Sequence, residues 1–408
     1  MIKLWLKRIK WLLVFVLLVP TLTGCWDRLE IEYRAVVLAI AIDEVTPEDK
    51  NESSNATQIV KNSGGSKKPL IKMTVQIAVP GRIPLGPGGT SESTAGQKPV
   101  WVLSSFGSTI DDSIMNLQQQ LADRLFFGHL RVIVVSEALA RKGIQNEKDF
   151  FRRQPQVRRT VWMVVSKGKA SEFMHATPQL ERVPSLYLLA TLDHATEMGM
   201  LPNYFLGVFY SASSAKGQEG VLPYLDLKKA SNIEIAGLAY FKGDKMKGTT
   251  TPLEIGHFLA MKQINPGGYS VMEQFPGSDT SVFFQSTHRK AKITTSIQDG
   301  KVHATVVCLI EGDLREKSNE NVTISKETLK QLEQKIEKDG KVSFEKLIQQ
   351  TQRDGSDIFG FGENVRAFQP AYWNREIKSK EKWEDMYKDI AVDVKLHIKI
   401  RRIGTKAK

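Results

Sequence analysis

The chain has 408 residues and a formal net charge of +12, from 57 Lys and Arg against 45 Asp and Glu. No compact run of Lys and Arg interleaved with aromatic residues accompanies this charge, so the sequence does not indicate a nucleic-acid-binding protein. The length and the 41% of hydrophobic residues predict a globular protein of two or three domains.

The N-terminus has the three parts of an exported bacterial leader. A basic start contains Lys3, Lys7, Arg8 and Lys10. The apolar run that follows, at 11–20, is shorter than the ~20 residues that a membrane-spanning helix needs. Next comes Leu22-Thr23-Gly24-Cys25, in which small residues separate a leucine from a cysteine three positions later, and this matches a lipoprotein signal.

We therefore expect residues 1–24 to be a signal peptide and Cys25 to be the lipidation site. The thiol would carry an S-diacylglycerol thioether, and the amino group freed by cleavage would carry an N-acyl chain such as palmitate. Each buried methylene contributes about 0.8 kcal/mol, so more than one chain anchors stably. Cleavage leaves a charge of +8, which favours an anionic leaflet. The alternative is an ordinary cysteine after an ordinary signal peptide.

Strand patterns open the body. Residues 35–42 form a continuous apolar run, typical of a strand covered on both faces, and residues 72–79 alternate as in a half-buried strand. We expect loops at 46–69 and 80–98, where small and polar residues gather. A short strand is expected at 101–105.

The clearest helix of the first half runs from a cap at Ser108 or Thr109 to Gly128, with apolar residues on one face. Further elements are expected in the order strand, helix, strand, helix, helix, at 130–135, 137–142, 160–165, 185–198 and 204–213. This spacing predicts a mixed sheet with helices packed on it. The small and polar residues 213–219 are expected to form a linker.

A second unit begins near Ile233. A hairpin over 233–241 and 245–248 precedes a helix with capping-box spacing at Thr251-Pro252-Leu253-Glu254. Strands are expected at 281–287, 291–298 and 301–310. Helices at 325–339 and 343–353 are expected to end at Gly340 and Gly355, and a last helix around Trp383 leads to a strand at 391–400.

These elements predict a multi-domain α+β protein with mixed or antiparallel sheets flanked by helices, behind the signal peptide. We divide it into an N-terminal α/β domain at 25–200, a middle domain with the hairpin and helix at 201–290, and a C-terminal α+β domain at 291–408.

Sequence motifs for catalysis or cofactor binding are absent. The seven histidines lack the spacing of a zinc-protease helix, and Gly86-Pro87-Gly88-Gly89 lacks the Lys-Ser/Thr pair of a phosphate-binding loop. Cys308 lies in an apolar run and is expected to be a buried small hydrophobe. We therefore expect no enzyme, no metal and no cofactor.

Four stretches of the chain carry a family pattern. They are GCWDRLEI at 24–31, GHLRVIVVS at 128–136, GLAYFKGDKMKG at 237–248 and DIFGFGE at 357–363. Together they resemble the Ger(x)C family, the lipoprotein C subunits of nutrient germinant receptors in endospore-forming bacteria. The first stretch is the most specific, and the loops at 46–69 and 80–98 look like variable insertions.

The resemblance implies a three-domain extracytoplasmic protein whose family C-terminal region spans about 233–408. It implies attachment through Cys25 to the outer face of the spore inner membrane. It also implies a complex with membrane-spanning receptor subunits, one A-type and one transporter-like B-type. The expected function is that of a non-catalytic subunit needed for nutrient-triggered germination, with membrane lipid and no nucleic acid among its partners.

Two other functions stay open at this point. A solute-binding lipoprotein would capture the nutrient directly in a cleft between domains. An envelope hydrolase acting on spore cortex would need paired carboxylates or a metal. Near the end of the chain, GFGE at 360–363 with Phe368, Tyr372 and Trp373 is a candidate partner surface, and the alternative is a glycine turn with core aromatics.

Overall fold

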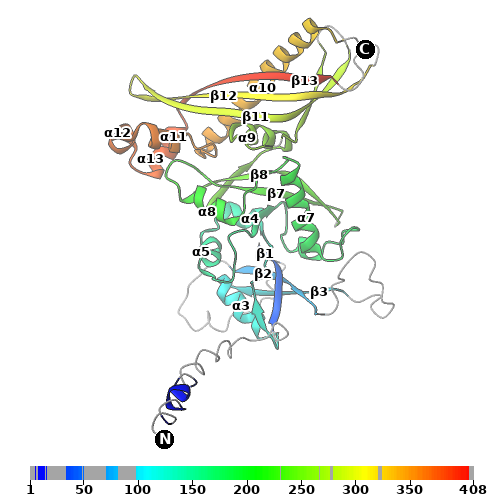
Figure 1. Ribbon diagram of the computed structural model, residues 1–408, viewed down its shortest axis with the longest axis vertical. Helices are drawn as coiled ribbons and strands as arrows, with labels where there is room; N and C mark the ends of the chain where they lie inside the picture. Colours follow the sequence, from blue (N-terminus) through cyan, green and yellow to red (C-terminus); the bar gives the residue numbers. More distant parts are fainter. Residues whose placement is uncertain are drawn as a thin grey trace.

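The computed structural model of the chain describes residues 5, 8–13, 15, 34–47, 49, 70–80, 98–229, 231–265, 267–275, 279–319 and 324–403. These residues form two β-sheets with helices packed on them, stacked along the long axis of the molecule (Figure 1). The α+β class with mixed sheets is therefore confirmed. Cys25 and most of the expected loops at 46–69 and 80–98 lie outside the described residues.

The first sheet has the strand order β3-β2-β1-β5-β6-β7-β8-β9, with β4 paired to β1. Strands β1, β4, β5, β6 and β7 are parallel to their neighbours in this group, and β2, β3, β8 and β9 pair antiparallel at the two sides. Helices cover both faces of the parallel centre, which is why its strands read as continuous apolar runs. The strands are β1 (Arg34–Glu44), β2 (Ile71–Ala78), β3 (Val100–Gly107), β4 (Arg124–Phe126), β5 (Val132–Ser136), β6 (Trp162–Ser166), β7 (Val221–Lys228), β8 (Asn232–Lys242) and β9 (Lys245–Thr249).

Alternate residues of the central strands face opposite helix layers. Ala39, Val132 and Trp162 share a core with α6 (Glu172–His175) and α7 (Pro184–Glu197). Ile40 and Ile133 share the other core with four helices on the opposite face. Those helices are α3 (Ile110–Gln118), α4 (Glu137–Lys142), α5 (Gln145–Arg153) and α8 (Leu206–Ser214).

The second sheet has the order β10-β11-β12-β13, with β13 parallel to β12 and the other pairs antiparallel. Val302, Ala304 and Val306 are buried under the helices, whereas the residues between them face outward, so one face of this sheet is open. The elements of this half are α9 (Pro252–Met261), β10 (Ser270–Gln274), β11 (Ser281–Gln298), β12 (Lys301–Lys317), α10 (Lys326–Asp354), α11 (Phe361–Phe368), α12 (Pro370–Tyr372), η4 (Trp373–Ile377), α13 (Lys380–Tyr387) and β13 (Ala391–Ile403).

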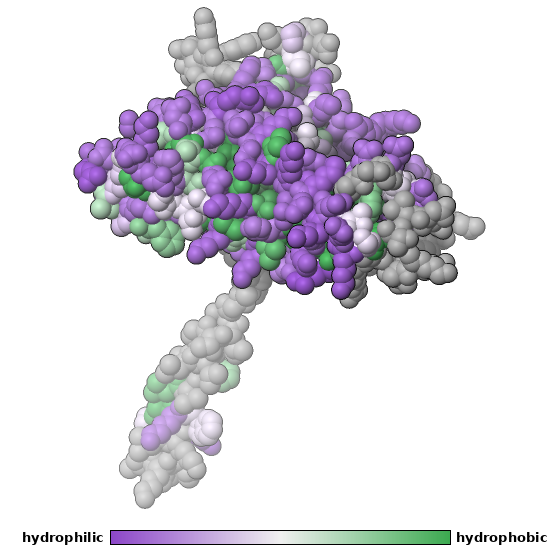
Figure 2. All heavy atoms as spheres, turned by 90° about the horizontal axis from the view of Figure 1, so that it is seen from above, coloured by the Kyte–Doolittle hydropathy of each residue, from purple (hydrophilic) through white to green (hydrophobic). Residues whose placement is uncertain are grey.

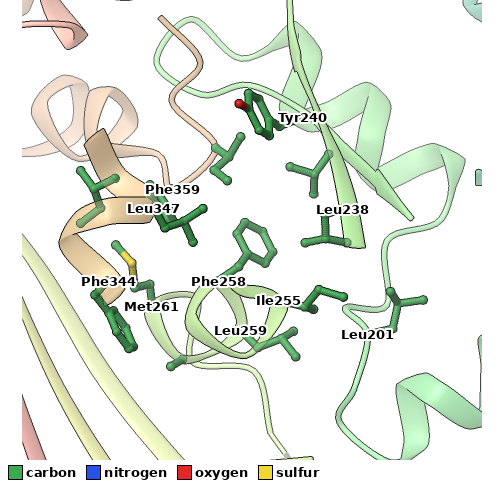
Figure 3. Close-up of a cluster of buried hydrophobic side chains, with 14 of the residues drawn as sticks. Leu201, Leu238, Tyr240, Ile255, Phe258, Leu259, Met261, Phe344, Leu347 and Phe359 are labelled. Carbon is green, nitrogen blue, oxygen red and sulfur yellow. The ribbon is translucent and has the colours of Figure 1, made fainter. Parts of the chain in front are cut away.

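Helix α9 joins the two halves through a shared apolar core. Phe258 points between Leu238 of β8 and Leu347 of α10 (Figure 3), and the helix also contacts β11 and β12. Its start has the expected capping box: Thr251 N–H donates to Glu254 Oε2 at 2.7 Å, and Glu254 N–H donates to Thr251 Oγ1 at 3.4 Å. One continuous core therefore ties the sheets together.

The predicted helix from 108 to 128 is wrong in its length. The Thr109 cap is present, but α3 ends at Gln118. The Gln118 side chain then turns the chain into β4, because its amide donates to Asp123 O at 2.8 Å and accepts from Leu125 N at 3.1 Å. In the sequence, Leu125 continues the apolar pattern of the helix. In the structure it packs into the same core, but from strand β4.

The strand predicted at 72–79 was expected to be half-buried, and this was wrong. Thr74 and Gln76 on its polar face are fully buried. The Gln76 amide donates to Met174 O at 3.0 Å and accepts from Ser185 N at 3.1 Å, and Thr74 Oγ1 lies 2.8 Å from Ser104 Oγ. Helices α6 and α7 can cover this face because the polar groups on it find hydrogen-bond partners within the protein.

Gly340 does not end a helix. The two helices predicted at 325–339 and 343–353 form the single 29-residue α10, which ends at Gly355 as expected. A Cβ on Gly340 would come within 2.6 Å of Leu396 Cδ2, so this glycine permits the close approach of β13. The strands predicted at 281–287 and 291–298 likewise form one strand, β11, with a register shift between Ser286 and His288.

The strands between residues 201 and 290 are divided between the two sheets. Strands β7, β8 and β9 complete the first sheet, and β10 with the start of β11 belongs to the second. The stretch expected to be a linker at 213–219 includes the end of α8, and Glu219 in it is buried. Strand β7 was not predicted; it contains Pro223, a residue that is rare in strands with neighbours on both sides.

Candidate functional site

The amino ends of several parallel strands meet at one edge of the first sheet. Arg34 begins β1 and is the register partner of Arg124, which begins β4. Arg131 directly precedes β5, and its backbone connects to both neighbouring strands, donating to Leu38 O and accepting from Trp162 N. Arg158 and Arg159 lie just before β6. Parallel pairing therefore gathers arginines that are far apart in the sequence.

Helix α5 adds Arg152 and Arg153 in its last turn, where cations suit the negative end of the helix dipole. The segment after α5 returns to this edge, since Phe127 N–H donates to Gln156 Oε1 at 2.9 Å. We call this set the arginine edge, and its members are Arg34, Arg124, Arg131, Arg152, Arg153, Arg158 and Arg159.

The arginine edge carries positive charge with little compensation. All its members except Arg34 are exposed, and none of the exposed ones forms an ion pair with a carboxylate among the described residues. The Arg34 guanidinium lies 4.6 Å from the centre of the Phe126 ring. A hollow of about 470 Å³ opens beside Arg124, Gln154 and Gln156. Such an edge suits phosphate groups, which guanidinium binds through paired hydrogen bonds.

The predicted lipidation site precedes this edge in the chain. Cys25 lies outside the described residues, and it stands nine positions before Arg34. In the leader, the described residues are helical, and the side chains of Trp11, Leu12 and Phe15 are about 70% exposed, so they do not pack on the body. Among the described residues, no helix combines the length and apolarity required for a membrane span.

A second polar cluster lies where the two halves of the molecule meet, around Asp357. The Asp357 carboxylate accepts hydrogen bonds from the backbone of Gly360 and Gly362, both at 2.8 Å, and from Trp383 Nε1 at 3.0 Å. Burial raises its pKa, and these hydrogen bonds oppose the shift. All three of these donors belong to the protein's own backbone and core, so Asp357 holds the turn before α11 in place.

The glycines of the GFGE motif allow two segments to cross. A Cβ on Gly362 would lie 2.4 Å from the Trp383 ring and 2.7 Å from Gly217 Cα. Glu363 N–H donates to Gly217 O at 3.0 Å, and Gly217 N–H donates to Glu363 Oε1 at 2.8 Å. The motif therefore packs α11 against the segment between α8 and β7.

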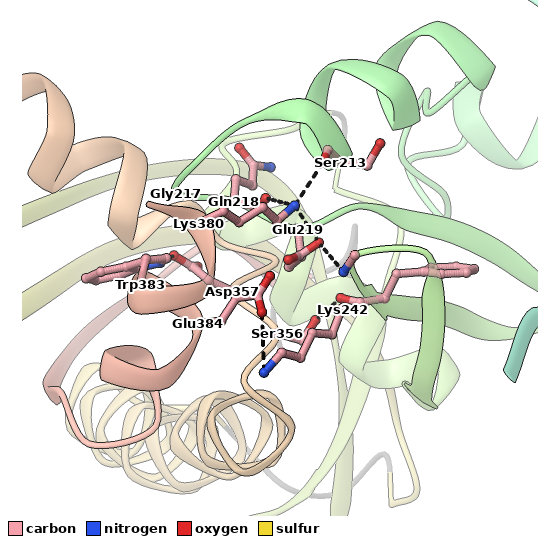
Figure 4. Close-up of polar contacts among 12 residues, drawn as sticks. Ser213, Gly217, Gln218, Glu219, Lys242, Ser356, Asp357, Lys380, Trp383 and Glu384 are labelled. Atoms are coloured by element: carbon pink, nitrogen blue, oxygen red, sulfur yellow. Dashed lines mark hydrogen bonds and ion pairs between the residues drawn. The ribbon is translucent and has the colours of Figure 1, made fainter. Parts of the chain in front are cut away.

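Two lysine–glutamate pairs extend this junction (Figure 4). Lys380 Nζ lies 3.0 Å from Glu219 Oε2, and Lys242 Nζ lies 3.3 Å from Glu384 Oε2. Burial raises the pKa of Glu219 to about 8, against the attraction of Lys380 and with the repulsion of Glu384 adding to it. Lys380 also donates to Ser213 O at 2.8 Å. These contacts fasten the second half of the chain to the first.

The candidate partner surface near the C-terminus is divided by the structure. Phe361, Tyr372 and Trp373 are buried in the core, which supports the interpretation as a glycine turn with core aromatics. Only Phe368 of the proposed aromatics is exposed.

Among the described residues, no three His, Cys, Asp or Glu side chains lie close enough together to bind a metal ion. Cys308 is buried as predicted, and burial raises the pKa of its thiol to about 12.

The arginine edge was not predicted. In the sequence only the pairs Arg152-Arg153 and Arg158-Arg159 indicate it, because the other members stand alone along the chain.

Two family models match consecutive parts of the chain. The model described as "Spore germination protein N-terminal domain" matches residues 27–227, and the model described as "Spore germination B3/ GerAC like, C-terminal" matches residues 236–404. Between them they cover both sheets.

Curated relatives match over nearly the whole length. The chain is 26% identical over 381 residues to the putative spore germination protein YfkR of Bacillus subtilis (strain 168), covering 91% of each chain. It is 24% identical to spore germination protein KC of the same organism, covering 96% of this chain and 95% of the relative. Spore germination protein GerQC of Bacillus cereus is 22% identical over 76% of this chain and 84% of its own length.

The fold is similar to that in the crystal structure of the GerBC protein. The TM-score is 0.54 with 17% sequence identity, and the match covers 82% of this chain and 94% of that chain. At this identity the similarity concerns the fold alone.

Proposed function

The chain belongs to the Ger(x)C family of spore germination proteins, and from this premise we propose that it is the lipid-anchored, non-catalytic subunit of a nutrient-responsive germinant receptor. Membership in the family gives it a role in spore germination. The observation that carries the finer proposal is the sequence Leu22-Thr23-Gly24-Cys25, placed directly before a family domain that begins at residue 27.

Lipidation at Cys25 holds the body to the outer face of the spore inner membrane. The S-diacylglycerol and the N-acyl group supply several hydrocarbon chains, each methylene contributing about 0.8 kcal/mol of membrane binding. The nine residues from Cys25 to Arg34 span at most about 30 Å. The start of β1 therefore stays close to the headgroups.

The arginine edge supports this arrangement, because it lies where β1 begins. Each arginine near an anionic surface contributes about 1 kcal/mol. The edge faces the lipid in this orientation, and the second sheet with α10 stands at the opposite end of the body (Figure 1). Lipid anchor and arginine edge thus act on the same side of the molecule.

The far end of the body is available to protein partners, and we assign it to the membrane-spanning A-type and transporter-like B-type subunits of the receptor. Figure 2 views this end, where hydrophilic side chains predominate and hydrophobic ones are scattered between them. The open face of the second sheet includes the partly exposed Phe283 and Leu309. In this assignment the spanning subunits sense the nutrient, and the body contributes surface for assembly.

The experiment is to replace Cys25 by Ala in the native protein and to follow lipid labelling, membrane retention and nutrient-triggered germination. We expect loss of label, release from the membrane and a weakened response, because the thiol is the point of lipid attachment. Cys308→Ala is the matched control, since it removes the other cysteine from a buried strand and leaves the signal intact. Normal labelling and retention in the Cys25 variant would refute the anchor.

A further inference from the structure

A cavity of about 300 Å³ lies between α9, α10 and the covered face of the second sheet. This is the lower end of the size range of small-molecule sites. Its walls are mostly apolar and include Phe284, Ile310, Ile336, Phe344 and Leu396. No residue of the arginine edge or of the polar cluster around Asp357 belongs to this lining.

One wall of the cavity carries the buried cation Arg289. Its side chain is on β11 and the residue is 3% exposed. Its Nε donates to Ser286 Oγ at 3.1 Å and its Nη1 donates to Ile264 O at 3.4 Å, but no described carboxylate forms an ion pair with it. Burial lowers the pKa of Arg289 to about 10. A buried cation without a counterion is costly, so this wall favours an incoming anion.

His257 of α9 lines the same cavity. Its Nδ1 is buried and has no hydrogen-bond partner in the described part of the chain. Its ring centre lies 4.5 Å from that of Phe344. Burial, with the neighbouring Arg289 charge, lowers the pKa of His257 to about 4, so the ring is neutral near pH 7. Arg289 therefore carries the positive charge at this wall of the cavity, and the neutral His257 ring can still form a hydrogen bond with a ligand.

The other charged groups of the cavity already have partners. Glu273 and Asp339 both bind Lys335, whose Nζ lies 2.6 Å and 2.7 Å from their carboxylates. The Tyr269 hydroxyl donates to Met200 O at 2.8 Å. Among the charged side chains of the described lining, Arg289 is therefore the one without an ion pair, and His257 Nδ1 is the buried atom without a hydrogen-bond partner.

We propose that this cavity is a binding site for a small organic anion, a carboxylate on an aliphatic body. The carboxylate would pair with the Arg289 guanidinium and reach His257, and the aliphatic part would lie against Phe284, Ile336 and Phe344. Paired hydrogen bonds between guanidinium and carboxylate supply orientation, and the apolar walls supply burial.

The test uses the full-length protein in nanodiscs, with 4-methylpentanoate as the probe and its neutral amide as the matched ligand. We expect calorimetry to show binding of the carboxylate, and binding of the amide weaker by about 10- to 100-fold, as for loss of a charge-assisted hydrogen bond. Arg289→Met should weaken carboxylate binding by the same factor. Arg315→Met, on an exposed position of the same sheet, should leave binding unchanged.

Folding of each variant is checked by thermal unfolding. If Arg289→Met fails to fold, Ser343→Leu decides, because it fills the cavity from α10 and keeps the arginine; it should abolish binding. The proposal is overturned if the wild type binds neither ligand, if the amide binds as well as the carboxylate, or if Ser343→Leu binds normally. Inorganic phosphate binding as tightly as 4-methylpentanoate would also overturn it, since the apolar walls would then contribute nothing.

Discussion

At the scale of single residues, burial decides the charge state of the groups between α9 and the second sheet. His257 is neutral at physiological pH because its surroundings are apolar and Arg289 is close, which together lower its pKa from 6.5 to about 4. The unfolded chain therefore binds a proton at His257 between pH 6.5 and 4 that the folded chain does not. Stability rises with pH across this window and is lost as the pH falls through it.

This sign leads to a prediction for His257→Phe. Phenylalanine keeps the contact with Phe344 and removes the titration, so the variant should lose less stability than the wild type between pH 7 and 4. The difference should be about 3 kcal/mol, from about 1.4 kcal/mol for each unit of pKa change. Urea unfolding followed by tryptophan fluorescence at the two pH values measures it. Parallel losses in both proteins would contradict the assignment.

At the scale of elements, two helical glycines show how packing overrides local preference. Gly340 in α10 faces the flexible end of Leu396, whereas Gly362 in α11 faces the Trp383 ring and the backbone of Gly217. Alanine is favoured over glycine in a helix interior by about 1 kcal/mol, which applies in full to Gly340 in the middle of α10. The neighbours, which differ in their ability to move, determine the net effect.

We therefore expect Gly362→Ala to destabilise the protein by about 1–3 kcal/mol, the usual cost of an overpacked core. Gly340→Ala should change stability by less than about 1 kcal/mol, because Leu396 can adjust and the helix gains propensity. Thermal unfolding of the two variants compares them directly. Equal effects would show that the crossing of α11 and the segment at Gly217 is looser than described.

At the scale of the whole molecule, basic side chains gather in two separate places. The arginine edge lies at the start of the parallel strands, next to the predicted anchor, and another basic set lies on the open face of the second sheet. The second set includes Lys290, Lys292, Lys395 and Lys399. Both sets contribute equally to the net charge that is read from the sequence, and only the structure shows that they lie in different places.

Replacing Arg152, Arg153, Arg158 and Arg159 by Gln should weaken binding of the unlipidated mature chain to phosphatidylglycerol vesicles by about 100-fold or more at low salt, since each nearby cation contributes about 1 kcal/mol. The matched control changes Lys290, Lys292, Lys395 and Lys399 to Gln and should retain most binding. Cosedimentation at several salt concentrations measures both. An equal loss in the two variants would mean that net charge alone drives adsorption.

Local chemistry made several features predictable. The apolar run at 35–42, the capping box at Thr251 and the strand at 301–310 each depend on neighbours within a few residues, and the structure contains β1, α9 and β12 there. The lipid signal before Cys25 is also a property of contiguous sequence, and it stays a prediction. The order of these local elements along the chain led to the fold class for the same reason.

Contacts between distant segments decided the rest. The buried Gln76 amide bonds to Met174 and Ser185, which are remote in the sequence. Helix α10 runs through Gly340, where the lack of a side chain leaves room for Leu396 of β13. Arginines from separate segments form one edge because β1, β4, β5 and β6 are parallel. The cavity beside Arg289 likewise exists only where α9, α10 and the second sheet come together. Sequence by itself determined the local elements and the family, whereas tertiary structure decided which polar groups are buried, paired or free to bind, because burial and pairing depend on neighbours that are remote along the chain.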